Sequence, residues 1–411
     1  MKLYAQHGAL QGDKTKVGIE KSYISGVIYS PRDIGVPQLR AHISEVARID
    51  PSAEQFFDPQ YYAGYNVTDP DARLGRLATC EDYEAYFRQR RRRELERDTR
   101  IIEADIADCL EFQMGLAVTG VISPNILITR SFDSIEGAIA KNFIRLSGQN
   151  RTNLGHGKPL FATLAVSREA LLDRGELFSF LEDITALDEP PDGFYVLVAA
   201  SSEDARADIL HADVIAGWLL INQSLSLNGY QVINGYSDVL TPFLRIAGAA
   251  AGATGWWQNS RTFSLGRFLP ASGGRLPIPR YLSKLLLNRI THIELAQITD
   301  LRARGRRIPA VLNGLETDSL YPPDAGYEPA RAEEVLQSWE ALHSLCEDLC
   351  RDDQIATLRL CRRAVTRAVQ AYDVIQSIIR LDPRSNAEHL SAIEEGIDLF
   401  VRLAEIGEPG A

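Results

Sequence analysis

Residues 231–257, QVINGYSDVLTPFLRIAGAAAGATGWW, combine two short strand patterns with one helical pattern. A β-branched run over 231–234 stops at Gly235, and a helix-period segment follows over 239–246. A Gly/Ala-rich turn then leads into a second short strand that ends in two tryptophans. This order is typical of the last two units of a (βα)8 barrel, where Gly-rich loops let backbone N–H groups approach a phosphate. The stretch therefore predicts a fold and the place of a ligand site, but it names no reaction.

Short β-branched or aromatic runs alternate with longer amphipathic stretches from residue 2 to about 257, which is typical of a parallel sheet built from βαβ units. The predicted strands cover 3–6, 26–29, 55–57, 120–122, 160–166, 193–199, 231–234 and 253–257. Eight strands, each followed by a helix, favour a closed α/β (βα)8 TIM-like barrel. The alternative is an open doubly wound sheet, but HGALQGDK after the first strand matches a nucleotide-binding Gly pattern only loosely.

The barrel is predicted to span residues 1–280, with a helical insertion over 63–118 after the third strand. The insertion reads as a polar loop followed by one long charged helix. Its run Arg90–Arg93 could contact an anion or nucleic acid, but the acidic residues that follow at once favour a solvated, internally paired helix face.

Residues 281–411 are predicted to form an almost wholly helical C-terminal domain. Its predicted helices lie near 281–303, 329–350, 353–380 and 386–406. This domain could cap the barrel, form a dimer surface or bind a protein partner, and the sequence does not choose between these roles.

Composition narrows the class of protein. The chain of 411 residues has a formal net charge of −11, which argues against a surface built mainly for nucleic acid. It contains no apolar run long enough to span a membrane, and its N-terminus lacks the apolar core of a signal peptide. Five scattered cysteines do not resemble a disulfide framework and are expected to be reduced. A cytoplasmic location is therefore expected.

Candidate catalytic residues are those at the predicted carboxyl ends of the strands, where barrel enzymes place their chemistry. Asp33 and Asp58 follow neighbouring strands and could divide acid and base roles. Each could instead cap a helix. His7 is the histidine at a predicted strand end, and it could act as an acid/base or simply be structural. No metal-site motif is found, although a weakly held Mg²⁺ is compatible with one or two carboxylates.

Candidate ligand-binding residues lie at the same strand ends and in the loops after them. They are Arg32, Gln60, Tyr62, Asn234, Gly235, Tyr236, Ser237, Gly255, Trp257, Asn259 and Arg261. The glycines, Ser237 and the following helix start are expected to hold an anion, although Asp238 would repel a phosphate there. Trp256 and Trp257 are expected to alternate across the eighth strand, so that one indole reaches the mouth and stacks on a planar ring. Arg261, Arg267, Arg275 and Arg280 follow in the next loop and suit a nucleotide, or the docking of the helical domain.

Some enzyme classes are disfavoured because the sequence lacks their catalytic residues at the predicted strand ends. No lysine falls at a predicted strand end, and no GxSxG elbow or strand-end cysteine is present. The pattern of strands seven and eight is similar to phosphate-binding barrels in general. The aromatic strand followed by NSRTFSLGR is similar to tRNA-guanine transglycosylases, whose cluster of closely spaced zinc-binding cysteines is missing here.

Two functions follow as hypotheses. The first is a barrel enzyme that acts on a nucleotide-like or phosphorylated small molecule by carboxylate acid/base chemistry, such as glycosyl transfer or hydrolysis. The second is a non-catalytic barrel that serves as a binding or scaffold subunit of a larger assembly.

Overall fold

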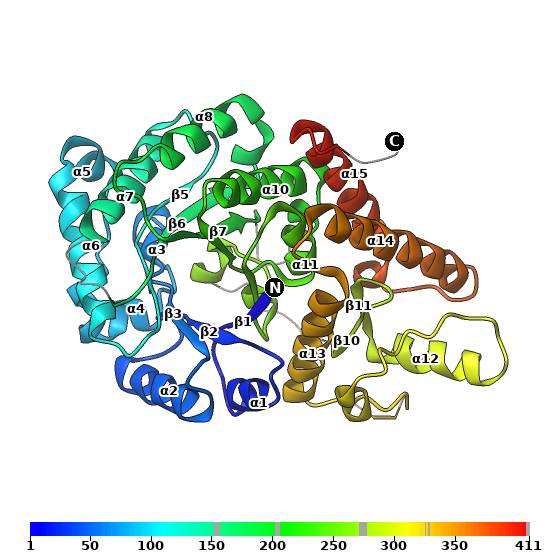
Figure 1. Ribbon diagram of the computed structural model, residues 1–411. Coiled ribbons are helices and arrows are strands. Elements are labelled where there is room, and N and C mark those ends of the chain that lie inside the picture. Colours follow the sequence, from blue (N-terminus) through cyan, green and yellow to red (C-terminus); the bar gives the residue numbers. More distant parts are fainter. Residues whose placement is uncertain (152–156, 202–205, 271–277, 325, 328, 408–411) are drawn as a thin grey trace.

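The computed structural model describes residues 1–411 except 152–156, 202–205, 271–277, 325, 328 and 408–411. In this part of the chain, helices alternate with strands to form a nearly closed eight-stranded parallel α/β barrel, followed by a mostly helical C-terminal region (Figure 1). The barrel strands are β1 (Lys2–Gln6), β2 (Gly26–Tyr29), β3 (Glu54–Phe57), β4 (Val121–Ile122), β5 (Leu127–Ile128), β6 (Leu160–Ser167), β7 (Gly193–Ala199), β8 (Gln231–Asn234) and β9 (Ala251–Thr254).

The sheet order over the described residues is β3-β2-β1-β9-β8-β7-β6-β4, with every neighbour parallel. The short strands β4 and β5 pair with successive parts of β6, so together they occupy one barrel position. Pro124 lies in the break between them and has no N–H for the ladder. The predicted parallel barrel with intervening helices is confirmed at this level.

The barrel has a seam between β3 and β4, where no strand pairing is formed by the described residues. The Thr119 backbone N–H donates to the Gln55 carbonyl oxygen at 2.8 Å. The Gln55 backbone N–H donates in return to Thr119 Oγ1 at 2.7 Å. These two residues bridge the seam, which makes the barrel nearly closed.

Helices cover the outside of the barrel and extend to one side of it (Figure 1). They are α1 (Lys14–Glu20), α2 (Val36–Ile49), α3 (Tyr61–Asn66), α4 (Arg76–Thr79), α5 (Arg92–Arg97), α6 (Thr99–Met114), α7 (Ile135–Asn150), α8 (Arg174–Thr185), α9 (Arg206–Ile209), α10 (Ala212–Leu227), α11 (Thr241–Leu244), α12 (His292–Ala303), α13 (Arg331–Leu349), α14 (Gln354–Gln376) and α15 (Glu388–Leu403). Helix α2 buries residues at three- and four-residue spacing, as an amphipathic surface helix should.

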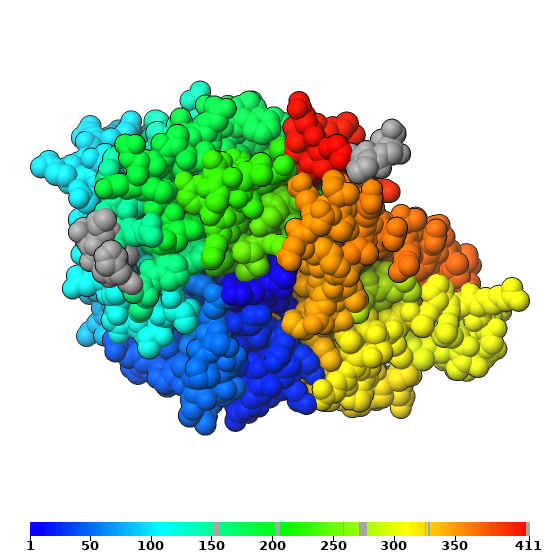
Figure 2. Space-filling model, in the orientation of Figure 1, coloured from blue at the N-terminus to red at the C-terminus, as the bar shows by residue number. Residues whose placement is uncertain are grey.

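Helix α10 differs because it is apolar on almost every face. It lies between the barrel strands on one side and α15 on the other, so it has no broad solvent face. Figure 2 shows the C-terminal residues, coloured yellow to red, lying directly against the blue and green residues of the barrel. No helix of the described chain is both long and apolar enough to cross a membrane.

The insertion after β3 is helical as predicted, but one long charged helix was the wrong expectation. Residues 87–91 are not helical, and α5 and α6 are separate because Asp98 caps α6 by accepting the Arg100 backbone N–H at 3.0 Å. Arg90 Nη2 lies 2.6 Å from Oδ1 of the buried Asp105. The interpretation of Arg90 as part of a solvated helix face is therefore wrong, because a buried carboxylate holds it.

The prediction of a helix beginning near residue 281 is also wrong. A hairpin of β10 (Arg280–Ser283) and β11 (Asn288–Thr291) precedes α12. The leucine-rich sequence between these strands reads as helical, but a side chain from α13 competes for the backbone. Gln337 accepts from the Leu282 N–H and donates to the Leu282 carbonyl, both at 2.9 Å. These tertiary hydrogen bonds hold β10 extended.

Candidate functional site

The carboxyl ends of the barrel strands meet in a buried polar cluster centred on Arg267. The Nη2 atom of Arg267 lies 2.9 Å from Asp33 Oδ2, and Nη1 donates to the Tyr236 hydroxyl oxygen at 2.6 Å. Asp33 also pairs with Arg32, whose Nη1 lies 2.8 Å from Asp33 Oδ1. Asp33 is therefore neutralised by two guanidinium groups.

Asp58 belongs to the same cluster. Its carboxylate accepts from the Tyr62 hydroxyl at 2.9 Å and from the Gln60 backbone N–H at 3.0 Å. Burial raises the pKa of Asp58 to about 6, against the lowering effect of these hydrogen bonds and of Arg267. The Tyr195 hydroxyl, from β7, lies 3.5 Å from Asp58 Oδ2.

Gln60 links the two carboxylates through Ser30. Its Nε2 donates to Ser30 Oγ at 2.8 Å, and Ser30 Oγ lies 3.1 Å from Asp33 Oδ2. Gln60 has a φ of 52°, a left-handed conformation that is uncommon for a residue with a side chain. Asp58, Gln60 and Arg267 are each at most 2% exposed, so this inner part of the cluster is closed to solvent.

His7 lies at the edge of this cluster. Its Nε2 is 3.1 Å from Gln11 Oε1, and its ring packs edge-on against Trp256. Burial lowers the pKa of His7 to about 4, and the nearby His42 adds to this, although Asp33 opposes it. The imidazole is therefore neutral at pH 7.

Several other predicted ligand-binding residues are occupied by contacts with protein groups. Asn234 Oδ1 accepts from the Trp218 indole on α10 at 2.6 Å, and Ser237 Oγ lies 2.7 Å from Thr241 Oγ1. A Cβ on Gly235 would lie 2.6 Å from the Tyr195 hydroxyl oxygen. A Cβ on Gly255 would collide with Ser260. These glycines therefore allow close packing of the protein on itself.

The two tryptophans do not alternate across a strand, because β9 ends at Thr254. Both indole N–H groups donate to the Ala9 carbonyl oxygen, at 2.7 Å for Trp256 and 2.9 Å for Trp257. The expected alternation is wrong because the chain has already left the sheet. Arg331 lies over the Trp257 ring, 5.5 Å from its centroid. Asn259 is half-buried in a short 3-10 helix beside them, and Arg275 lies outside the described residues.

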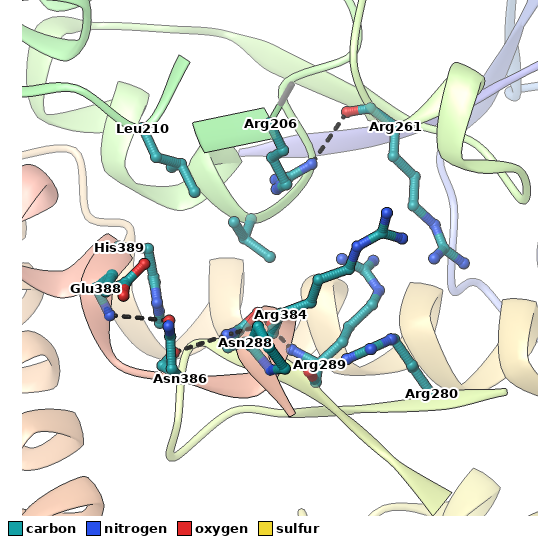
Figure 3. A pocket seen from close by; sticks show the side chains of 12 residues that line it. Arg206, Leu210, Arg261, Arg280, Asn288, Arg289, Arg384, Asn386, Glu388 and His389 are labelled. Carbon is teal, nitrogen blue, oxygen red and sulfur yellow. Dashed lines mark hydrogen bonds between the residues drawn. The ribbon is translucent and has the colours of Figure 1, made fainter. Parts of the chain in front are cut away.

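A cavity of about 380 Å³ lies between the barrel and the C-terminal region. Five arginines contribute to its wall: Arg206, Arg261, Arg280, Arg289 and Arg384. The other lining residues are Leu210, Val239, Asn288, Pro383, Asn386, Glu388 and His389. Figure 3 shows the arginines reaching toward one another from the barrel side and from the hairpin side. We call this cavity the arginine pocket.

Four stretches of chain position these arginines. Arg206 opens α9 after β7, and Arg261 follows β9, so both stand at the carboxyl-end face of the barrel. Arg280 and Arg289 face the barrel from the β10–β11 hairpin, and Arg280 is fixed by Asp382 at 2.6 Å. The segment that leads into α15 completes the wall.

Asp238 organises the inner part of the pocket. Arg289 grips it with two parallel hydrogen bonds, from Nη1 to Oδ2 at 2.7 Å and from Nη2 to Oδ1 at 2.8 Å. Arg206 Nη2 lies 2.9 Å from the same carboxylate. Burial alone would raise the pKa of Asp238, but Arg289 and Arg206 lower it well below its usual range. Asp238 was expected to repel a phosphate. In the structure its carboxylate is instead paired with the guanidinium groups of Arg206 and Arg289 and holds both in place.

The inner arginines crowd one another. Arg261 Nη2 lies 3.0 Å from Glu334 Oε1, a carboxylate that also pairs with Arg331. Burial lowers the pKa of Arg261, and the nearby Arg289 lowers it further. Burial likewise lowers the pKa of Arg206, with Arg289 and Arg261 contributing although Asp238 opposes it. The inner wall of the arginine pocket therefore concentrates positive charge in a buried region. This arrangement favours the binding of an anion.

The structure brings together Asp33, Asp58, Arg32, Gln60, Tyr62 and Tyr236 of the predicted site, with His7 nearby. Of the arginines that the sequence pointed to, Arg261 and Arg280 line the arginine pocket. Sequence reasoning missed Arg206 and Arg289, because one lies well beyond its strand and the other lies in a segment that reads as helical. The described part of the chain gathers no three His, Cys, Asp or Glu side chains that could hold a metal ion.

No protein-family model matches the sequence, and no curated protein matches it significantly.

Proposed function

We propose that this protein binds a small phosphorylated, nucleotide-like molecule in the arginine pocket. The observation that carries the proposal is the convergence of five arginines from separate parts of the chain on one cavity. Guanidinium groups match phosphate oxygens in geometry as well as in charge. The proposal treats the barrel as a member of the TIM-like (βα)8 class. In that class the ligand sites lie at the carboxyl ends of the strands, which is the face that carries Arg206 and Arg261.

The charge balance supports an anionic ligand. Asp238 is shared by Arg206 and Arg289, and Glu334 pairs with Arg261 as well as with Arg331. Two carboxylates therefore face the three guanidinium groups of Arg206, Arg261 and Arg289 at the inner wall. An anionic ligand would offset the difference. The cavity volume is also within the range of about 300–1,000 Å³ that is usual for small-molecule sites.

Isothermal titration calorimetry with inorganic phosphate and ribose 5-phosphate tests the proposal. We expect both to bind the unmodified protein, and Arg206→Gln to weaken binding about tenfold or more, because a charge-assisted hydrogen bond is lost. Asp238 keeps its paired Arg289 in this variant, so the fold is expected to persist. Arg304→Gln removes an exposed arginine at the C-terminal end of α12 and serves as the control. Absence of binding by either probe, or equal affinity in Arg206→Gln, would contradict the proposal.

A second candidate function makes the protein an enzyme. It is favoured by Asp58, a buried carboxyl whose raised pKa of about 6 suits a general acid or base near neutral pH. A small cavity of about 10 Å³ shares Arg206 with the lining of the arginine pocket, and it is also lined by Tyr236, which hydrogen-bonds to Arg267 of the cluster. This candidate requires the bound molecule to reach Asp58 from the arginine pocket. In that case Asp33 would act indirectly, because it holds the Arg267 guanidinium group that would stabilise charge on the reacting molecule.

The catalytic candidate is tested by incubating an extract of phosphorylated metabolites with the purified protein and following masses consumed and formed. We expect the unmodified protein to convert at least one compound, and Asp58→Asn to lose that conversion while ribose 5-phosphate still binds. Equal conversion by Asp58→Asn would remove Asp58 from the chemistry. Retained binding with no conversion by either protein would leave the non-catalytic binding subunit as the supported function.

A further inference from the structure

Three of the five cysteines gather where the C-terminal helices pack on the barrel. Cys346 lies in the last turn of α13, Cys350 caps that helix, and Cys361 lies in α14. Both helices pack against α11. The Cys350 Sγ lies 3.7 Å from the Pro242 carbonyl oxygen of α11, and the Cys361 Sγ lies 4.0 Å from the same oxygen. All three cysteines are free thiols, so the contact between these helices contains sulfur that can be oxidised.

Cys346 and Cys350 lie one helical turn apart on the same face of α13. The Cys350 backbone N–H donates to the Cys346 carbonyl oxygen at 2.9 Å, and the two thiols are also hydrogen-bonded to each other. In a regular helix this spacing places the Cα atoms about 6 Å apart, a distance that a disulfide can span. Cys350 has already left the helical conformation, with φ of −86° and ψ of 133°. A bond between the two sulfurs would therefore form at a helix end, where the backbone can adjust.

The two thiols differ in exposure and in the charges around them. Cys346 is buried, whereas Cys350 is partly exposed. Arg351 donates from Nη1 to the Cys350 carbonyl oxygen at 2.7 Å, and Arg245 donates from Nε to the Arg351 carbonyl oxygen at 3.2 Å. The hydrogen bond from Cys346 lowers the pKa of Cys350, and Arg245 and Arg351 lower it further, although burial opposes them. Cys350 is therefore the thiol that more readily becomes a thiolate, the reactive form of cysteine.

A cavity of about 340 Å³ lies beside this pair, at the amino-end face of the barrel. Met1 and Arg245 contribute to its wall, together with residues at the start of several barrel strands. The Met1 Sδ lies 3.9 Å from the Cys350 Sγ. The wall of the cavity thus includes a side chain in direct contact with the Cys350 thiol, and a molecule as small as hydrogen peroxide can come close to it.

We propose that Cys350 is a peroxide-reactive thiol and that Cys346 resolves its oxidation by forming a disulfide with it. The Cys350 thiolate attacks one oxygen of hydrogen peroxide, the O–O bond breaks, and the departing hydroxide takes up a proton to leave as water. Cys350 then carries a sulfenic acid. The Cys346 sulfur attacks the Cys350 sulfur, the S–O bond breaks, and the hydroxide leaves with the Cys346 proton as a second water. The pair of thiols loses two electrons, and the peroxide gains them.

The disulfide changes how α13 is held against the barrel. Side chains four residues apart on a helix have Cβ atoms about 5–6 Å from each other, whereas a disulfide brings them to about 4 Å. Closing this distance draws the Cys350 sulfur toward Cys346 and away from Pro242. The contact between α13 and α11 is therefore weakened by oxidation and restored by reduction.

Peroxide treatment of the full chain without reductant, followed by mass spectrometry of its peptides, tests the proposal. We expect Cys346 and Cys350 together to lose two hydrogen atoms and to regain them with dithiothreitol. Cys350 should react about tenfold faster than Cys80 or more, because its thiolate is better stabilised. Cys80 is the matched control. It is also partly exposed, but its Sγ lies 3.7 Å from the Asp82 Oδ2, a carboxylate that disfavours a thiolate.

Two variants separate the roles of the thiols. In Cys346→Ser, oxidation of Cys350 should stop at the sulfenic acid, which dimedone labels. In Cys361→Ser, the disulfide should form at an unchanged rate. If Cys346→Ser does not fold, the comparison of Cys350 with Cys80 in the unmodified protein still decides whether Cys350 is the reactive thiol.

Four results would overturn the proposal. They are the absence of a disulfide at a peroxide concentration that fully oxidises Cys80, a disulfide from Cys350 to Cys361, a Cys350 that reacts no faster than Cys80, and oxidation of Met1 in place of the thiols.

Discussion

At the scale of single residues, Asp58 combines full burial with hydrogen bonds from Tyr62 and from the Gln60 backbone. Burial raises its pKa to about 6, above the ordinary value of 3.8. Between these two values the folded protein holds a proton that the unfolded chain releases. The contribution of Asp58 to the unfolding free energy is therefore greatest below about pH 4. Stability then falls as the pH rises to about 6 and stays at the lower level above it.

Asp58→Asn should remove this part of the pH dependence, because an amide does not titrate. From the two pKa values, at about 1.4 kcal/mol per unit of pKa, the unfolding free energy of the unmodified protein should fall by about 2 kcal/mol between pH 4 and pH 7 through this residue. Urea unfolding at pH 4, 5, 6 and 7 measures the difference between the two proteins. Asp71→Asn, at an exposed position of the polar loop, should keep the original profile. Parallel profiles for Asp58→Asn and the unmodified protein would show that Asp58 does not titrate in this range.

At the scale of elements, α15 owes its position to Gly396. A Cβ on this residue would lie 2.8 Å from the Ile215 Cβ and 3.0 Å from the Ala212 carbonyl oxygen, both on α10. The absence of a side chain therefore lets the two helices approach closely. Since Glu388 and His389 belong to the first turn of α15, the same contact sets one wall of the arginine pocket.

Gly396→Ala should destabilise the protein by about 1–3 kcal/mol, because steric overlap with α10 exceeds the gain in helix propensity of about 1 kcal/mol. It should also weaken ribose 5-phosphate binding, since α15 must shift. Chemical denaturation and calorimetry measure the two effects. In Gly407→Ala the added methyl meets no atom within 4 Å, and both quantities should be unchanged. Unchanged stability in Gly396→Ala would mean that the helices relax without strain.

Strands 160–167 and 193–199 were predictable because both are buried over their whole length and read as continuous apolar runs. The convergence of Asp33 with Asp58 followed from neighbouring parallel strands. The hairpin of residues 280–291 was not predictable, because Gln337, far along the chain, holds β10 extended. The arginine pocket was missed for the same reason, as Arg289 and His389 meet the barrel only through tertiary packing.

At the scale of the whole molecule, the arginine pocket joins parts of the chain that are distant in sequence. Arg206 and Arg261 come from the barrel, whereas Arg289 and the segment 383–389 come from the C-terminal region. A ligand held by both sides would bind the assembled molecule and not its separated parts. The cytoplasmic location expected from the cysteines stays a prediction.

Ribose 5-phosphate at 100 times its dissociation constant should raise the unfolding free energy by about 2.7 kcal/mol. Hydrogen exchange should slow in β10, β11 and residues 383–389 as well as around Arg206. The insertion helices α5 and α6 do not line the pocket and should exchange at an unchanged rate. Mass spectrometry of peptides from the exchanged protein measures this pattern. Protection confined to the barrel loops would show that the C-terminal segments do not take part in binding.

The pairing of β1 with β9 has a consequence for the newborn chain. Residues 2–5 lie beside residues 251–254, so the first strand of the barrel finds one of its two partners only in β9, the last strand of the barrel to be synthesised. Translation proceeds at about 5–20 residues per second, and β1 therefore waits tens of seconds or less with one edge unpaired. An unpaired strand edge can join other chains. In the cell, the interval between these two strands is thus when the protein is most exposed to aggregation and to chaperones.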